Sequence, residues 1–432
     1  MSSTLILLLA LVVASPVFLA IDTPTAGLLL TFFVAVMLGL AGIAARSTEA
    51  EHVWRIIRAL LSLALVPAIW MVVQIVPTPF LAHPIWQSAA GAFDVPLSGK
   101  ISADPGLTFQ ALLGYVTVLG IALAALCVAV DRRRAHYVLR ALVAVSGFVT
   151  IAFVVMTIGS LRFSGSPDLA GTDAAFAAIC NLGMVLSASL IVSALDQYQL
   201  RRHGTSISGG VLAEFCAGGS VFAICFLTAA IDAPRFVLVA GLCGLLPVFL
   251  VVFLRQVPSH RWEKSVVVGI VVVVAAVVVL SRFEKGSGDV ALRAAAGAAP
   301  AQTAIAARMM ADAGPLGMGV GTYAALVPIY RGIDDPPAVL AAPTAAAEIS
   351  IELGRSALVA IPLIGAVLAI ALFRRALARG RDSLYAAAGS GCAVLLTLQM
   401  FCDASLTAAG LVVLAAVTIG LALGQSLSLP RS

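Results

Sequence analysis

Charged residues are scarce in this chain. Asp, Glu, Lys and Arg make up 11% of its 432 residues, whereas a soluble globular protein carries roughly 25%. Hydrophobic residues make up 61%, and a compact soluble fold has too little interior to bury that much apolar surface. The composition therefore excludes a soluble enzyme, a disordered chain and a nucleic-acid-binding protein. It indicates a protein that crosses a membrane several times and contacts membrane lipids.

The chain also lacks the residue spacings that hold metals or disulfides. Its seven cysteines all fall in apolar runs, and none forms a CxxC pair. The five histidines offer no pair at metal-ligand spacing. The sequence therefore predicts neither a disulfide framework nor a metal site, and it indicates no cofactor.

Long apolar runs dominate what remains. A helix needs about 20 apolar residues to cross a bilayer, and inside lipid the backbone must satisfy its own hydrogen bonds, which favours helices. We therefore predict an all-α integral membrane protein with about twelve transmembrane helices. The first of them is either a retained helix, which the absence of a preceding Lys or Arg favours, or a cleaved signal peptide. The predicted spans are 4–21, 25–45, 56–77, 107–130, 138–159, 173–195, 209–229, 235–254, 265–281, 350–373, 384–402 and 406–424.

The basic residues predict the orientation of these helices. Cytoplasmic loops carry an excess of Lys and Arg, and with twelve spans the short loops on one side hold only Lys100, Arg162 and Arg235. Both termini are therefore expected in the cytoplasm. The opposite side receives Arg46, Arg55, Arg58, Arg132, Arg133, Arg134, Arg140, Arg201, Arg202, Arg255, Arg261, Lys264, Arg374, Arg375, Arg379, Arg381 and Arg431.

This arrangement leaves one large periplasmic loop, 282–349, between helices 9 and 10. It follows helices 1–9 (residues 1–281) and precedes helices 10–12 with a short cytoplasmic tail (residues 350–432). A loop this long is usually functional or disordered. It contains a predicted helix over 301–313, and Pro343 predicts that the next helix begins near Thr344.

A glycine-rich turn and three isolated charges are the local features that could carry chemistry. The turn contains Gly319 and Gly321, and such a turn either brings backbone N–H groups to a phosphate or is simply a tight turn. Arg235 binds phosphate, lies among lipid headgroups or pairs with Asp232. Glu214, inside the seventh span, marks an ion path or reaches the interface. Asp403, between the last two spans, is a site residue or a helix cap.

Several segments, in the same order along the chain, resemble the O-antigen ligase and polymerase superfamily. Phe401–Leu406 resembles its V-D-F-x-L turn, and Glu352-Leu353-Gly354 resembles its E-x-G motif. The most specific similarity lies in the long loop. There, Met309–Tyr323 resembles M-x-x-D-x-P-L-x-G-x-G-x-G-T-F. The other matches are Gln74–Pro77 and Ile101–Pro105 with Thr108, which resemble the family's first outer loop, Arg162–Pro167 with R-x-S-G-T-F, and Leu227-Thr228 and Arg235 with T-x-S-R.

The resemblance implies a metal-independent glycosyltransferase of cell-surface polysaccharide assembly, which would build lipopolysaccharide, O-antigen or exopolysaccharide. Such proteins transfer or polymerise a glycan linked to undecaprenyl pyrophosphate, at the periplasmic face of the bacterial inner membrane, onto a lipid or glycan acceptor. The departing pyrophosphate needs cations, and the acceptor hydroxyl needs a base. The resemblance suggests as substrate-binding residues Arg162, Arg235, Arg308, Gly319, Gly321 and Asp403.

The sequence departs from the family at its His-Asn motif. The corresponding stretch is Ala341–Ala346, in which Thr344 is the only polar residue, and Glu348 is the nearest titratable replacement. Two interpretations follow. In one, the protein is a transferase that uses as its catalytic base Glu348 or another carboxylate such as Asp168, Asp334 or Asp335. In the other, it is a non-catalytic membrane component of a polysaccharide assembly complex. A secondary transporter or glycolipid flippase is a third alternative, which Glu214 suggests.

Overall fold

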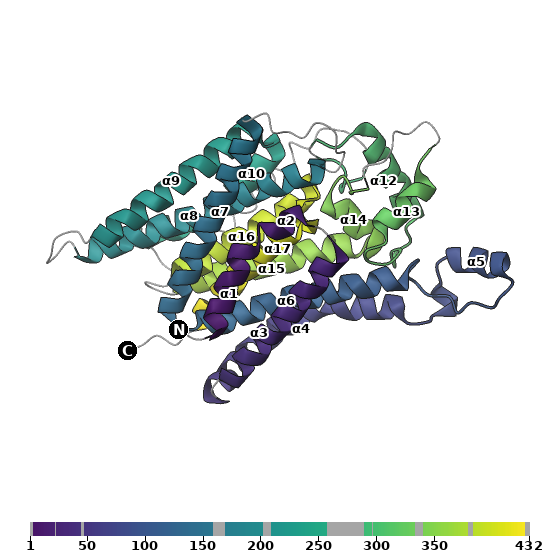
Figure 1. The fold of residues 1–432 in the computed structure, drawn as a ribbon, viewed down its shortest axis with the longest axis horizontal. Helices are drawn as coiled ribbons and strands as arrows, with labels where there is room; N and C mark the ends of the chain where they lie inside the picture. The colour runs from purple at the N-terminus through teal and green to yellow at the C-terminus, as the bar shows by residue number, and fades with distance from the viewer. Residues whose placement is uncertain are drawn as a thin grey trace.

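The computed structural model describes residues 3–21, 23–44, 47–158, 169–201, 209–256, 289–295, 297–332, 340–378 and 383–427. Within these ranges the protein is all-α, with one isolated β-bridge between Pro77 and Lys100. The all-α part of the predicted fold class is therefore confirmed (Figure 1), while the orientation of the helices stays a prediction. Large apolar side chains such as Phe32, which is 70% exposed, cover the flanks of the helices, as in a protein surrounded by lipid.

Nine of the described helices are long and apolar enough to cross a membrane, which makes this a multi-pass membrane protein. They are α3 (Pro24–Ala44), α6 (Pro105–Ala129), α7 (Arg132–Ile158), α8 (Leu169–Arg201), α9 (Gly209–Asp232), α10 (Arg235–Gln256), α15 (Ala357–Ala378), α16 (Ser383–Cys402) and α17 (Ala409–Leu427). The other described helices are α1 (Ser3–Ala14), α2 (Val17–Ala20), α4 (Ser47–Ile75), α5 (Ile85–Phe93), α12 (Pro300–Asp312), α13 (Tyr323–Tyr330), α14 (Ala345–Glu352), η1 (Pro79–Leu81) and η2 (Ser405–Thr407).

The predicted count of twelve spans stays a prediction. The run 4–21 is divided into α1 and α2 at Ser15 and Pro16, and the run 56–77 corresponds to the last part of α4, whose apolar stretch Leu60–Ile75 is short. The run 265–281 lies outside the described residues.

The tenth predicted span begins later than expected. We predicted one helix from 350, but α14 ends at Glu352 and the spanning helix α15 begins at Ala357. Gly354 lies between them with φ +96°, a conformation that favours glycine and interrupts an α-helix. The break also contains Arg355 and Ser356, which the predicted span 350–373 included.

The centre of the bundle is built by α8, α16 and α17. Helix α17 packs against α6 and α16, and α8 packs against α9, α10 and α7. Small residues allow the closest crossings. A Cβ at Gly391 of α16 would lie 2.3 Å from the carbonyl oxygen of Gly244 in α10, and one at Gly420 of α17 would lie 2.3 Å from that of Ala122 in α6.

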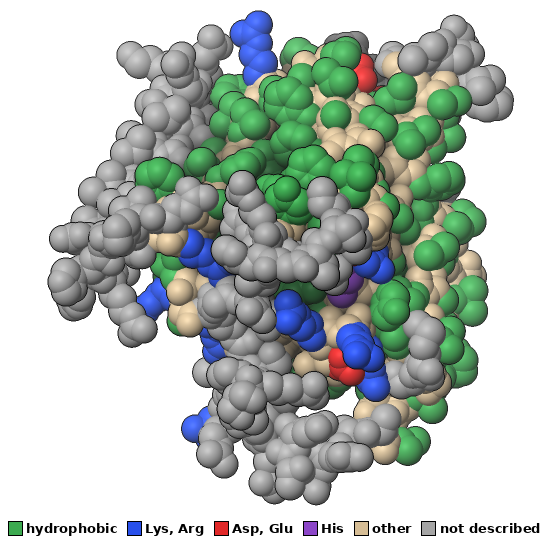
Figure 2. Space-filling model, turned by 90° about the vertical axis from the view of Figure 1, so that its left-hand side faces the viewer, with side chains coloured by type: hydrophobic (Ala, Val, Ile, Leu, Met, Phe, Trp, Pro, Cys, Tyr) green, Lys and Arg blue, Asp and Glu red, His purple; other side chains and the backbone are tan. Residues whose placement is uncertain are grey.

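The two ends of the bundle differ. At the end that we call the loop end, residues 289–332 and 340–352 form α12, α13 and α14 around a second hydrophobic core, which also includes Met400 of α16. These helices are green at the right of Figure 1, far from both termini. Figure 2 shows the left-hand side of the molecule in Figure 1, away from these helices, where several Lys and Arg side chains gather. The predicted helix 301–313 is confirmed as α12.

Candidate functional site

The glycine-rich turn between α12 and α13 binds the end of α14. The Met318 N–H donates to the Ile351 carbonyl oxygen at 2.8 Å, and the Gly319 N–H donates to the Glu352 carbonyl oxygen at 3.1 Å. The Tyr323 N–H donates to the Glu352 carboxylate at 3.0 Å. The carboxylate of Glu352 thus sits where an anion-binding turn would hold a ligand.

These contacts favour the tight-turn interpretation. Gly317 and Gly319 have φ values of +77° and +107°, which favour glycine. A Cβ at Gly317 would lie 2.2 Å from the Glu352 carbonyl oxygen. The backbone amides of this turn therefore have partners inside the protein, and they provide no support for phosphate binding by Gly319 or Gly321.

Gln74, near the end of α4, connects the turn to the membrane helices. Its side chain is 0% exposed. Its Nε2 donates to the carbonyl oxygens of Leu316 at 3.1 Å and Glu352 at 2.9 Å, and its Oε1 accepts from the Val320 N–H at 3.3 Å. Sequence analysis did not identify this role. The available signal was a single amide side chain inside a long apolar run.

Helix α14 begins where Pro343 predicted. The Thr344 hydroxyl accepts from the Ala347 N–H at 3.0 Å and donates to the Ala291 carbonyl oxygen at 2.7 Å, which is an N-cap. Glu348 and Glu352 follow four residues apart, so they occupy one face of the helix. Glu352 is 5% exposed, whereas Glu348 is only partly buried.

Both carboxyl groups of α14 titrate above their ordinary range. Burial removes them from water and raises the pKa of Glu348 and of Glu352, and the Glu352 charge raises the pKa of Glu348 further. The N–H groups of Gly321 and Tyr323 oppose this shift at Glu352. A carboxyl with a raised pKa is suited to proton transfer near neutral pH, and Glu348 is the more exposed of the two residues.

Asp403 joins the α16–α17 connection to α14. Its side chain is 5% exposed. Its Oδ1 accepts from the Ser405 N–H at 3.0 Å, and its Oδ2 accepts from Gln399 Nε2 at 2.6 Å. Its carbonyl oxygen accepts from the Ala345 N–H at 2.9 Å. Burial raises the pKa of the Asp403 carboxyl to about 6, and the hydrogen bonds from Ser405 and Gln399 oppose that rise.

The arginines that we predicted to bind substrate are not gathered in one place as these groups are. Arg235 is the exposed first residue of α10, and Arg308 is exposed on α12, where its Nε lies 3.4 Å from the Ala304 carbonyl oxygen. Helices α10 and α12 are not among the packed pairs in the described part of the chain. Arg162 lies outside the described residues. The structure thus brings together α14, the glycine turn and Asp403, and phosphate binding by the arginines stays a prediction.

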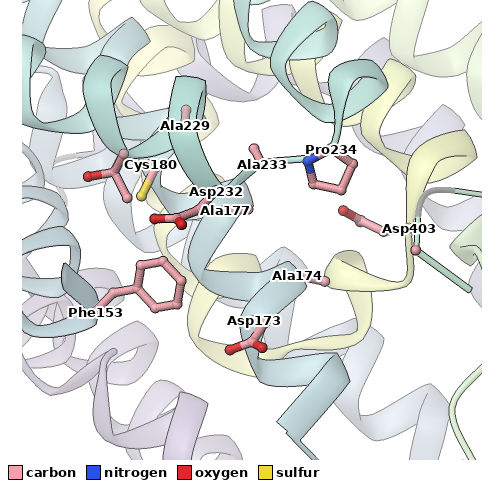
Figure 3. Close-up of a pocket in the computed structure, with 12 residues that line it drawn as sticks. Phe153, Asp173, Ala174, Ala177, Cys180, Ala229, Asp232, Ala233, Pro234 and Asp403 are labelled. Carbon is pink, nitrogen blue, oxygen red and sulfur yellow. The ribbon is translucent and has the colours of Figure 1, made fainter. Parts of the chain in front are cut away.

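A cavity of about 280 Å³ opens beside Asp403 at the loop end. Figure 3 shows the carboxylates of Asp173 and Asp232 on its other sides, together with the ring of Phe153. Sequence analysis did not identify Asp173, and it gave Asp232 only as a possible partner of Arg235. Asp173 and Asp232 each lie where an apolar run ends at the membrane boundary, and that position was the signal in the sequence that could have found them. No group of three or more possible metal ligands occurs among the described residues.

At the other end of the bundle, Glu214 of α9 is paired. Its carboxylate binds the Arg140 guanidinium and lies 3.3 Å from His136 Nε2, both on α7. His136 Nδ1 in turn lies 3.4 Å from the Tyr385 hydroxyl of α16. The pairing makes this intramembrane carboxylate part of a connection between three helices, and the transporter alternative stays a prediction.

No protein-family model matches the chain, and no curated protein matches it. The family resemblance therefore rests on the sequence motifs alone.

Proposed function

We propose that this chain is an O-antigen ligase-like membrane protein of bacterial cell-surface polysaccharide assembly. It would act at the outer face of the inner membrane on a glycan linked to undecaprenyl pyrophosphate. The observation that carries the proposal is the position of Glu348. The folded loop holds this partly exposed residue on α14, one helical turn from the Ala345 N–H that binds the Asp403 carbonyl oxygen.

The proposed reaction is glycosyl transfer. The acceptor hydroxyl gives its proton to the Glu348 carboxylate, and its oxygen forms a bond to the anomeric carbon of the glycan. The bond from that carbon to the pyrophosphate breaks, and the pyrophosphate leaves on its lipid. The raised pKa of Glu348 supports this role, since a base with a pKa near the working pH transfers protons efficiently. Cations for the pyrophosphate would come from Arg162, Arg235 and Arg308.

A second candidate function is a non-catalytic component of the same assembly system. The occupied amides of the glycine turn favour it, because Glu352 takes the place that a ligand anion would fill. The absence of the family's His-Asn motif favours it too. Helices α12–α14 would then serve as a docking surface for another assembly protein.

The experiment is a reconstituted transfer assay with a lipid-linked glycan, comparing the wild type with Glu348→Gln. We expect the variant to lose about 100-fold or more of its rate, because a positioned base contributes at least that much. Asp94→Asn is the matched control, since Asp94 is exposed, has φ +48°, and Asn tolerates that conformation. Equal thermal unfolding of both variants excludes a folding defect.

The two candidate functions give different results in this assay. Activity that survives in Glu348→Gln would rule out Glu348 as the base. A wild type without activity toward any lipid or glycan acceptor would support the non-catalytic component.

A further inference from the structure

Glu352 is held at both its carboxylate and its backbone carbonyl oxygen. The carboxylate accepts from the Tyr323 N–H at 3.0 Å and from the Gly321 N–H. The carbonyl oxygen accepts from the Gly319 N–H at 3.1 Å and from Gln74 Nε2 at 2.9 Å. Only 5% of Glu352 is exposed. Its negative charge therefore has a fixed position inside the folded loop.

Glu348 lies on the same face of α14 as this charge. The two residues are four positions apart, which places their side chains one above the other on the helix. The Tyr323 side chain lies near both of them. Burial, and then the charges of Glu348 and Glu352, raise the pKa of its hydroxyl. The three side chains thus form one cluster beside the glycine turn.

The hydrogen bonds decide the order in which the two carboxyl groups ionise. Burial raises the pKa of both. The N–H donors of Gly321 and Tyr323 stabilise the ionised form of Glu352 and so oppose that rise. The Glu352 charge raises the pKa of Glu348 further. Glu352 therefore ionises first, and Glu348 binds its proton more strongly because a negative charge lies beside it.

Other ionisable groups at the loop end belong to segments that contact α14. In the described part of the chain they are Asp289, Arg293, Arg308, Asp312, Tyr330, Arg355, Cys402 and Asp403. The three carboxylates among them accept hydrogen bonds from groups outside α14. The Arg355 guanidinium donates to a carbonyl oxygen of α12. Glu352 is therefore the neighbouring charge that acts on Glu348 in the described structure.

We propose that Glu352 is a positioning residue for the Glu348 base. The glycine turn fixes the Glu352 charge on the face of α14 that carries Glu348, and this charge makes Glu348 a stronger base than a lone carboxylate. The inference rests on the proposed function, because the role of Glu348 as a base belongs to it. The interaction between the two carboxyl groups follows from the fold alone, so it can be measured without transfer activity.

The first measurement follows the ionisation of Glu348 directly. Carbon-13 NMR of glutamate side chains is recorded against pH in the full-length protein, and the signal that disappears in Glu348→Gln identifies Glu348. We expect Glu352→Gln to lower the pH midpoint of Glu348 by about one unit or more, since a like charge nearby is removed. Asp94→Asn, which removes an exposed carboxylate, should leave the midpoint unchanged. An unmoved midpoint in Glu352→Gln would overturn the proposal.

A second variant separates the charge of Glu352 from its hydrogen bonds to the turn. Glu352→Asp keeps a negative charge on the same face of α14, but its shorter side chain does not reach the Tyr323 N–H. We expect its midpoint to stay closer to that of the wild type than the midpoint of Glu352→Gln does. Equal falls in the two variants would mean that the turn and not the charge acts on Glu348, which would also overturn the proposal.

The pH profile of transfer is the final readout. Transfer needs ionised Glu348, so Glu352→Gln should move the acidic limb of the profile to lower pH by the same shift. It should also lower the rate at high pH several-fold, because a weaker base accepts the proton less readily. A purely structural role would lower the rate at every pH and leave the limb in place, which would contradict the inference. A wild type without transfer activity would overturn the proposed function, whereas transfer that needs Glu348 with an unmoved midpoint would overturn this inference alone.

Discussion

Replacing Gln74 by Leu should loosen the loop from the membrane helices. Leu has a similar size and suits the apolar surroundings of α4, so the substitution mainly removes hydrogen bonds. Three are lost, namely those to the Leu316 and Glu352 carbonyl oxygens and the one from the Val320 N–H. Glu352 keeps a donor, because the Gly319 N–H also binds its carbonyl oxygen.

The magnitude follows from these bonds. A hydrogen bond contributes about 1 kcal/mol net, and an unpaired buried group costs about 1–3 kcal/mol. Leu316 and Val320 are only partly buried, so water replaces some of what is lost. We therefore expect the opening free energy of the turn to fall by about 2–4 kcal/mol.

Amide hydrogen exchange measures this opening directly. The N–H groups of Met318 and Gly319, which bind α14, should exchange roughly 30- to 1,000-fold faster in Gln74→Leu. Gln87→Leu is the matched control, since Gln87 is exposed on α5. Unchanged exchange at Met318 and Gly319 would refute the role of Gln74 as the connection between α4 and the loop.

Two further predictions concern stability. Gly317→Ala should lower the unfolding free energy by more than about 2 kcal/mol, because Gly317 has a positive φ and lies next to the Glu352 carbonyl oxygen. Gly314→Ala is the control and should not lower it, because a Cβ at Gly314 would meet open space. Equal melting temperatures of the two variants would contradict this prediction. The second prediction concerns Asp403, whose folded pKa of about 6 exceeds the ordinary 3.8, so wild-type stability should fall by up to about 3 kcal/mol as pH rises from about 4 to above 6. Asp403→Asn should make that fall clearly shallower in thermal unfolding between pH 4 and 6, while the raised pKa values of Glu348 and Glu352 keep a slope of the same sign in both proteins. An equally steep fall in the variant would contradict this assignment.

Local patterns predicted much of the fold. Nine apolar runs correspond to helices long enough to cross a membrane, since hydropathy reports directly whether a segment prefers lipid. The loop helix α12 and the start of α14 at Thr344 were also predicted. These features depend on residues that are neighbours in the sequence. For example, Pro343 favours an extended backbone at the residue before it.

The candidate site was predicted only in part. The sequence indicated Glu348, Asp403 and the glycine turn, and the structure places them at one end of the bundle. It did not indicate that Glu352 would occupy the turn, because a carboxylate and a backbone amide attract each other at any sequence separation. The sequence also did not show that Arg235 and Arg308 lie on two helices that do not pack together in the described structure.

The all-α class and the positions of most spans depend on the sequence alone, because burial in lipid selects apolar helices whatever their neighbours are. The cavity between Asp173, Asp232 and Asp403 depends on tertiary packing. These carboxylates lie far apart in the chain and converge because α8, α9 and α16 all have an end on the same side of the bundle. Helix crossings at small residues such as Gly391 determine which ends meet. Shape complementarity between helices decides these crossings, and the sequence of a single apolar run does not reveal it.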